Sequence, residues 1–99
     1  MFLPPVSFPY GAAHASELRY LFKLTWPGRL DVQQQRLSSG MIRYWTQFAA
    51  TGDPNSASEP VWSPYSAATD QFQSFVPPTP TVESTFGTDH LCTTLWDFL

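Results

Sequence analysis

Charged side chains are scarce in this chain of 99 residues, in which Asp, Glu, Lys and Arg together make up 13%. That share is roughly half of what is usual in globular domains. Disordered chains combine high charge with low hydrophobicity, whereas 42% of these residues are hydrophobic, so the composition excludes a disordered tail. Positive charge is the scarcest, with five Lys and Arg against eight Asp and Glu and a net charge of −3. Since there is no basic stripe, we do not expect nucleic acid as a partner.

Cysteine and long apolar runs are also lacking. Cys92 is the single cysteine, so the chain can form neither an internal disulfide nor a multi-cysteine zinc site. No apolar run approaches the ~20 residues of a transmembrane helix, and we therefore expect no membrane span. The first residues carry no positive charge and are interrupted by Pro4 and Pro5, which is not the pattern of a signal peptide. The sequence leaves the cellular compartment open.

Aromatic residues and proline, by contrast, are abundant. Phe, Trp and Tyr make up 16% of the chain, and there are ten prolines. A chain of this length buries only about 60–65% of the surface that it exposes when unfolded. So many bulky rings and proline-rich loops need a larger core than a free-standing domain of this size supplies. The composition therefore predicts that residues 1–99 are an incomplete domain that other protein covers.

The most regular pattern predicts a helix from Val32 to Thr51. Asp31 and Gln34 have the spacing of a capping box at its start. Gly52 suits the left-handed position at its end, and the Asp-Pro-Asn sequence that follows cannot continue the helix. The large apolar residues recur on one helical face, which we interpret as core: Leu37, Met41, Tyr44, Trp45 and Phe48.

Two further segments have helical spacing. The Pro-rich residues 1–13 are expected to form an extended arm or loop, followed by a short helix or helical turn over residues 14–23 that ends before the Trp-Pro-Gly sequence at 26–28. A second amphipathic helix is expected from Thr88 to Leu99, docked on a core by Trp96. Its apolar face consists of Leu91, Cys92, Leu95, Trp96 and Leu99.

The middle of the chain is predicted to be a loop followed by one short strand. Residues 53–70 are the loop, which Trp62 and Tyr65 are expected to hold onto a surface. Residues 71–76 alternate weakly in polarity, and this favours a strand that ends at the Pro-Pro-Thr-Pro sequence. The alternation places Phe72 on one face and three residues on the other: Gln71, Gln73 and Phe75.

No complete active site is visible, because the chain has no G-x-S-x-G elbow, no Gly-rich phosphate loop and no Cys/His metal spacing. His14 and Glu17 could share a helix face, but two ligands do not make a metal site. From the residues alone, a structural role for His14 is favoured over a catalytic one. We interpret His90 as a surface or helix-start residue, and Cys92 as a buried thiol or half of a disulfide. No chemistry is assigned to two neighbouring hydroxyls, Ser38 and Ser39.

One stretch changes this interpretation of His14. The histidine is followed by Ala15, a serine and Glu17, and then by Tyr-Leu-Phe at residues 20–22. This stretch resembles the segment around the catalytic histidine of the type-B carboxylesterases, the family that includes cholinesterases and bacterial p-nitrobenzyl esterases. There the histidine precedes Gly or Ala, a variable residue, Glu and an aromatic-aliphatic-Phe run. Many members have Gly where this chain has Ala15.

Three further pieces follow in the order of the same family. Residues 37–55, which end in Tyr-Trp-x-x-Phe-Ala and Thr-Gly-Asp-Pro-Asn, look like its long C-terminal helix. The last piece runs from Asp89 to Asp97, and in it the spacing from Cys92 to Trp96 is one residue longer than usual. Between them lies a similar spacing of prolines and aromatic residues: Pro60, Trp62, Pro64 and Tyr65. The resemblance thus covers nearly the whole chain.

The resemblance implies an α/β fold. Residues 1–99 would be the C-terminal portion of an α/β-hydrolase domain, with mainly helices and loops and at most one or two short strands. The long helix and the terminal helix would cover one face of the sheet, and the missing N-terminal portion of the domain would be their partner.

The resemblance also implies an enzyme that hydrolyses small carboxylic esters through a Ser-Glu/Asp-His triad, in that chain order. His14 would be the last member and the general base. Glu17 would either brace the His14 loop through backbone hydrogen bonds or be an exposed helix carboxylate. The serine, the acid and the oxyanion-hole glycines would lie upstream, so the isolated chain would be inactive. No cofactor and no metal are expected.

Two alternatives stay open. One is a non-catalytic, cholinesterase-like adhesion protein that uses the same fold for binding. The other is a free-standing binding module or a remnant that begins at Met1, although its apolar helix face would then be exposed. An upstream serine in a nucleophile elbow would separate the enzyme from both alternatives.

Overall fold

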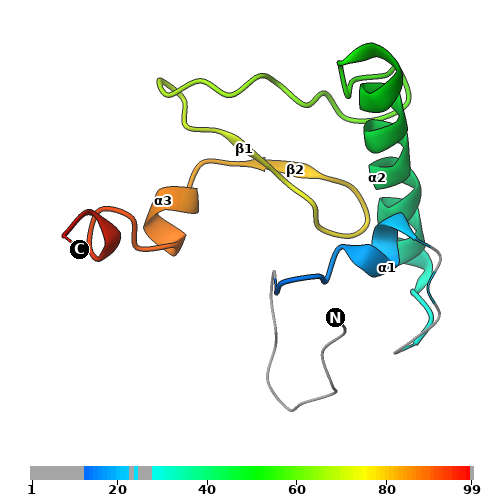
Figure 1. Ribbon diagram of the computed structural model, residues 1–99, viewed down its shortest axis with the longest axis horizontal. Coiled ribbons are helices and arrows are strands. Elements are labelled where there is room, and N and C mark those ends of the chain that lie inside the picture. Colours follow the sequence, from blue (N-terminus) through cyan, green and yellow to red (C-terminus); the bar gives the residue numbers. More distant parts are fainter. Residues whose placement is uncertain (1–12, 23, 25–27, 99) are drawn as a thin grey trace.

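Helix α2 dominates the computed structural model, and the other elements lie to one side of it (Figure 1). The structure describes residues 13–22, 24 and 28–98. No helix within these ranges is long and apolar enough to cross a membrane. The expected extended arm falls almost entirely outside them. In chain order the elements are α1 (Leu18–Leu21), α2 (Val32–Thr51), β1 (Phe72–Ser74), β2 (Thr81–Glu83), α3 (Phe86–Asp89) and the 3-10 helix η1 (Trp96–Phe98).

Helix α2 has the bounds that its end signals predict. The Asp31 carboxylate accepts a hydrogen bond from the Gln34 backbone N–H at 2.8 Å, and the Gln34 side chain accepts one from the Asp31 N–H at 2.9 Å. This reciprocal pair satisfies two donors that a helix start leaves without partners. At the other end Gly52 has φ +80°, and its N–H donates to the Phe48 carbonyl at 2.7 Å. The predicted capping box and left-handed end are both confirmed.

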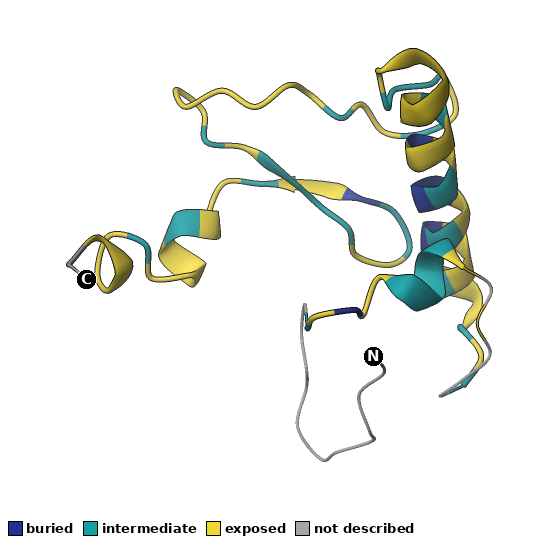
Figure 2. Ribbon diagram, viewed as in Figure 1, coloured by how far each residue is buried: buried dark blue, intermediate teal, exposed yellow. Residues whose placement is uncertain are grey.

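The apolar face of α2 is buried over only part of its length. Leu37, Met41 and Tyr44 are buried, as predicted for core residues. Trp45 and Phe48 are 42% and 58% exposed, so the same prediction is wrong for them in this structure. Buried stretches of α2 lie on the side toward the strands, whereas its C-terminal turns are largely exposed (Figure 2). The strands are too short to cover the whole helix face.

The two strands form an antiparallel hairpin. Phe72 pairs with Glu83 and Ser74 with Thr81. The expected strand over residues 71–76 is confirmed in its centre, whereas β2 was not predicted. The Pro-Pro-Thr-Pro sequence at 77–80 begins the return of the chain to β2, with a cis Pro77–Pro78 peptide.

The two faces of β1 pack as the polarity pattern predicts. The Phe72 ring lies 4.7 Å from the Phe86 ring, at the α3 end of the molecule. Gln73 instead points to α2, where its amide donates to the Tyr44 hydroxyl at 3.4 Å. Phe75, on the same face as Gln73, packs against Tyr44 with 5.9 Å between the ring centres. The hairpin therefore joins α2 on one side and α3 on the other.

The predicted terminal helix from Thr88 to Leu99 is wrong over its described residues. Helix α3 ends at Asp89, turns follow over residues 90–95, and η1 begins at Trp96. Leu91 has φ +58°, a left-handed conformation that a right-handed helix cannot include. Trp96 is 61% exposed, so it does not dock this segment on a core. A short amphipathic segment needs a surface for its apolar face, and the described chain provides none here.

The short helix or helical turn that is expected within residues 14–23 is confirmed over its described residues. Turns occupy residues 14–17, and only the four residues of α1 are helical. Helix α1 packs beside α2, near its N-terminal half (Figure 1). Four residues are too few for a helix that is stable by itself, so α1 depends on contacts with the rest of the chain.

Candidate functional site

His14 lies in the turn directly before α1, and its side chain is exposed. Backbone hydrogen bonds join this turn to the helix: the Ser16 N–H donates to the Ala13 carbonyl at 3.1 Å, and the Leu18 N–H donates to the Ala15 carbonyl at 3.3 Å. The imidazole is thus free to meet another group, while the backbone that carries it has a defined conformation. A general base that must reach a group on another segment needs this combination.

Ala15 explains why a small residue follows the histidine. Its φ is +66°, in the left-handed region, and its side chain is only 8% exposed. Glycine adopts this conformation without a steric penalty, and alanine has the smallest side chain among the other residues. A larger side chain would meet both the backbone restriction and the close packing around the turn. The departure from the Gly of many carboxylesterases therefore preserves the turn at a modest cost.

Glu17 sits at the start of α1. Its backbone carbonyl accepts hydrogen bonds from the Tyr20 and Leu21 N–H groups at 3.0 and 3.1 Å. Its carboxylate is exposed and does not cap the helix. The expected bracing of the His14 loop by this side chain stays a prediction.

Two side chains fasten α1 to α2 and to the segment before it. The Ser38 hydroxyl of α2 donates a hydrogen bond to the Tyr20 carbonyl. The Arg19 guanidinium donates through Nη2 to the Gly28 carbonyl at 2.9 Å, and both contacts are partly buried. The Arg19 Nε–H is buried and has no hydrogen-bond partner among the described residues. Sequence reasoning missed Ser38, because nothing in its local pattern shows that a helix 18 residues away in sequence lies beside it.

An aromatic cluster joins α2, the following loop and the hairpin. The Trp62 ring meets those of Tyr44 and Phe75 edge to face, at 5.5 and 5.1 Å between ring centres. Trp45 packs on Phe75 at 5.6 Å. Such edge-to-face pairs contribute beyond the apolar area that they bury. Trp62 thus holds the loop onto a surface, as predicted, and an apolar groove of about 260 Å³ runs between Tyr44, Trp45, Phe48, Pro54 and Trp62.

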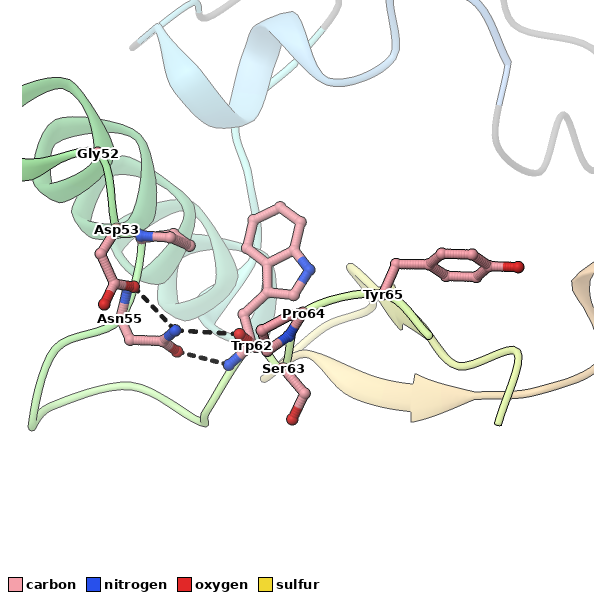
Figure 3. A pocket seen from close by; sticks show the side chains of 8 residues that line it. Gly52, Asp53, Asn55, Trp62, Ser63, Pro64 and Tyr65 are labelled. Atoms are coloured by element: carbon pink, nitrogen blue, oxygen red, sulfur yellow. Dashed lines mark hydrogen bonds between the residues drawn. The ribbon is translucent and has the colours of Figure 1, made fainter. Parts of the chain in front are cut away.

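The Asp-Pro-Asn turn after α2 is a structural clip. The Asn55 side chain accepts a hydrogen bond from the Trp62 N–H at 2.6 Å and donates to the Trp62 carbonyl and the Asp53 carboxylate, both at 3.0 Å (Figure 3). A pocket of about 520 Å³ lies beside this turn. Because the oxygen and the nitrogen of the Asn55 amide already have hydrogen-bond partners, we interpret the turn as a structural feature that fixes the loop conformation.

Tyr65 packs differently from Trp62. It is 59% exposed, and its hydroxyl donates to the Asp70 carboxylate at 2.9 Å. This hydrogen bond to a carboxylate raises the pKa of the Tyr65 hydroxyl. Its ring lies 5.3 Å from that of Phe72, so Tyr65 holds its part of the loop against the hairpin.

The remaining candidate side chains have structural surroundings. The His90 ring stacks on Phe86 with 4.0 Å between ring centres, and its Nδ1 lies 2.8 Å from the Phe86 carbonyl. His90 is therefore a surface residue at the end of α3, close to its interpretation from sequence. Cys92 is a free, half-buried thiol, less buried than expected. Within the described ranges, no three His, Cys, Asp or Glu residues gather as a metal site would require.

The comparisons with known proteins agree with the resemblance. A model of the carboxylesterase family matches residues 3–91. The chain is 40% identical to bile salt-activated lipase of Bos taurus over 67 residues, which are 63% of this chain and 11% of that protein. It is 43% identical to bile salt-activated lipase of Rattus norvegicus over 60 residues, 56% of this chain and 10% of that protein.

A second kind of relative is also matched. The chain is 36% identical to carboxylesterase 5A of Canis lupus familiaris over 63 residues, 56% of this chain and 11% of that protein. The chain thus spans about a tenth of the length of the curated relatives that it matches. Since the family model matches most of its residues, the chain belongs to the carboxylesterase family, which implies an α/β-hydrolase fold.

Proposed function

We propose that this chain is the C-terminal part of a serine carboxylesterase and that His14 is the general base of its Ser-Glu/Asp-His triad. The observation that carries the proposal is the exposed imidazole of His14 on an ordered turn, in a chain that belongs to this family. The names of its relatives, bile salt-activated lipase and carboxylesterase 5A, support a small or lipid-like carboxylic ester as substrate. Its motifs also resemble the bacterial p-nitrobenzyl esterases, so a p-nitrophenyl ester is a suitable probe.

The proposed chemistry needs one proton relay at His14. The imidazole takes the proton of the serine hydroxyl while the serine oxygen attacks the ester carbonyl, and then returns that proton to the leaving alcohol. Water repeats the sequence on the acyl-enzyme and releases the carboxylic acid. The serine, the triad acid and the donors of the oxyanion hole would come from protein upstream of this chain.

The shape of the chain supports an incomplete domain. The radius of gyration is 15.5 Å, larger than the ~13 Å of a compact domain of this length. Among the described residues only five with apolar side chains are buried: Ala15, Leu37, Met41, Tyr44 and Pro80. Upstream protein packed on the exposed part of α2 would give this segment the core that its aromatic residues require.

The test uses the complete reading frame from which this chain comes. We expect it to encode a G-x-S-x-G elbow and an acidic residue upstream of His14, and its product to hydrolyse p-nitrophenyl acetate. His14→Ala should lower kcat by a factor of about 10⁴ or more, since a triad acts as a unit. His90→Ala is the matched control, because it removes another exposed imidazole and should leave kcat within about twofold of the wild type.

Two results would overturn the proposal. A complete product that hydrolyses esters equally well with His14→Ala would place the general base elsewhere. A complete reading frame without a nucleophile elbow would favour the non-catalytic alternative, in which the exposed aromatic face of α2 serves binding.

A further inference from the structure

We propose that Ser38 and Arg19 are positioning residues for the proposed reaction, because together they hold α1 on α2 and thereby fix the turn that carries His14. This inference rests on the proposed function of His14. Neither side chain is expected to touch the substrate, and both would act through the location of the His14 backbone.

The turn that carries His14 and helix α1 form one hydrogen-bonded unit. Two backbone bonds, from Ser16 to Ala13 and from Leu18 to Ala15, link the residues on both sides of His14 to the start of the helix. The Phe22 N–H closes the other end of α1 on the Leu18 carbonyl at 2.9 Å. A displacement of α1 therefore moves the His14 backbone with it.

Helix α1 is held in place by hydrogen bonds to residues outside it. A helix of one turn leaves its last carbonyls without intrahelical partners. Ser38 fills one of these positions with its hydrogen bond to the Tyr20 carbonyl. Arg19, the neighbouring residue, binds the Gly28 carbonyl three residues before the capping residue of α2. The two contacts join α1 to different parts of the chain that follows it, one to α2 itself and the other to the segment that leads into α2.

Helix α2 provides a rigid support for α1. It is 20 residues long and capped at both ends, and Ser38 follows the buried Leu37. The Ser38 side chain is half-buried against α1, whereas the next residue, Ser39, is exposed. Ser38 and Ser39 are adjacent on one helix, and they differ in whether the side chain contacts α1.

The consequence is a selective effect on kcat. Proton transfer requires the imidazole to lie within hydrogen-bond distance of the serine hydroxyl, and a displacement of about 1 Å can cost about 10²-fold in rate. Ground-state binding of the ester does not use this contact. Loss of the tie should therefore lower kcat and leave KM nearly unchanged.

The experiment compares Ser38→Ala with Ser39→Ala in the complete esterase, with p-nitrophenyl acetate as substrate. We expect Ser38→Ala to lower kcat by about 10- to 100-fold with KM within twofold, and Ser39→Ala to match the wild type. Ser38→Thr keeps the hydroxyl and should restore most of kcat. Ser38→Cys keeps the size with a weaker donor, so its kcat should lie between those of Ser38→Ala and the wild type.

Substitution of Arg19 tests the inference independently of Ser38. Arg19→Ala should also lower kcat without a comparable change in KM, whereas Arg36→Ala removes an exposed arginine of α2 and should have no effect. Equal kcat values for Ser38→Ala and Ser39→Ala would overturn the inference, as would a loss in Ser38→Ala that Ser38→Thr does not restore. His14→Ala in the same series separates the two proposals. If it abolishes activity while Ser38→Ala does not lower it, the general base stands and the positioning role fails.

Discussion

At the scale of single residues, Tyr44 shows how a polar group is kept inside this small core. Its ring is fully buried, while its hydroxyl donates to the Pro60 carbonyl and accepts from Gln73. Burial raises the pKa of the Tyr44 hydroxyl, and the negative charge of Glu59 raises it further, whereas the Gln73 hydrogen bond opposes the change. Tyr44 thus joins helix, loop and hairpin, and its hydrogen bond to the Pro60 carbonyl exists only while the hydroxyl keeps its proton.

Replacement of Tyr44 by Phe tests this role. The variant leaves the Pro60 carbonyl without its donor, so we expect it to lose about 1 kcal/mol of stability near neutral pH. Because the folded pKa of Tyr44 lies above the ordinary value of 10.0, its contribution is complete below that value and is lost as the pH rises through the folded pKa. Urea unfolding of the complete esterase, at neutral and at alkaline pH, measures both effects.

The exposed Tyr65 is the control for this pair of measurements. Tyr65→Phe removes a hydroxyl that is bonded to Asp70 in solvent, where such contacts contribute little. We expect its stability to follow that of the wild type at neutral pH. If Tyr44→Phe loses as much stability as the wild type at alkaline pH, groups other than Tyr44 cause that loss.

At the scale of elements, α2 is determined by signals within its own sequence. Its capping box, apolar face and final glycine all indicate the same bounds, and local signals of this kind act before tertiary contacts form. Glu59 then fastens the loop to the helix: its carboxylate lies over Gly40 and pairs with Arg43 at 2.5 Å. Helix and loop therefore form one unit that presents the aromatic cluster.

Gly52, which ends α2, and Gly28, which precedes its capping residue Asp31, provide a prediction for this element. Gly52→Ala introduces a side chain at φ +80°, and we expect it to destabilise α2 by about 1 kcal/mol. Gly28→Ala is the matched control, because an added Cβ meets nothing within 4 Å and the backbone is not left-handed. Helical ellipticity at 222 nm during urea unfolding of the complete esterase measures the difference in stability between the two variants. Equal midpoints for the two variants would contradict the assigned role of Gly52.

At the scale of the whole molecule, the chain presents more apolar surface than it covers. Large apolar side chains are exposed on α2, β2, α3 and η1, among them Trp45, Phe48, Val82, Phe86 and Trp96. The apolar groove beside Trp45, Phe48 and Trp62 is the kind of patch that other protein covers. Together with a span of about a tenth of the matched relatives, this favours a chain that completes its fold only with upstream protein.

The isolated chain therefore provides the prediction for the molecule as a whole. Since the nucleophile and the oxyanion hole are proposed to lie outside this chain, His14 alone would offer weak general-base catalysis. We expect the isolated chain to hydrolyse p-nitrophenyl acetate no faster than free imidazole at the same concentration, in a spectrophotometric assay of p-nitrophenolate release. A rate typical of serine hydrolases that His14→Ala abolishes would mean that the described segment contains a complete site.

The candidate site was only partly predictable from sequence. His14 stands out by its resemblance to a family motif, because no spacing around it distinguishes a base from a structural histidine. The left-handed backbone at Ala15 has no local signal, since alanine is common in helices and strongly disfavours that conformation. The contact of Ser38 with α1 depends on how two helices pack, which no single segment determines.

Sequence by itself determined α2 and its caps, the two faces of β1 and the loop position of Trp62, because short-range hydrogen bonds and polarity patterns specify them. Tertiary structure decided that the chain returns as β2 after the prolines, that the C-terminal segment breaks at Leu91, and that Ser38 meets Tyr20. These features depend on which surfaces are available to pair with or to bury. A segment adopts the conformation that its local pattern favours only where contacts with neighbouring segments do not favour another conformation more.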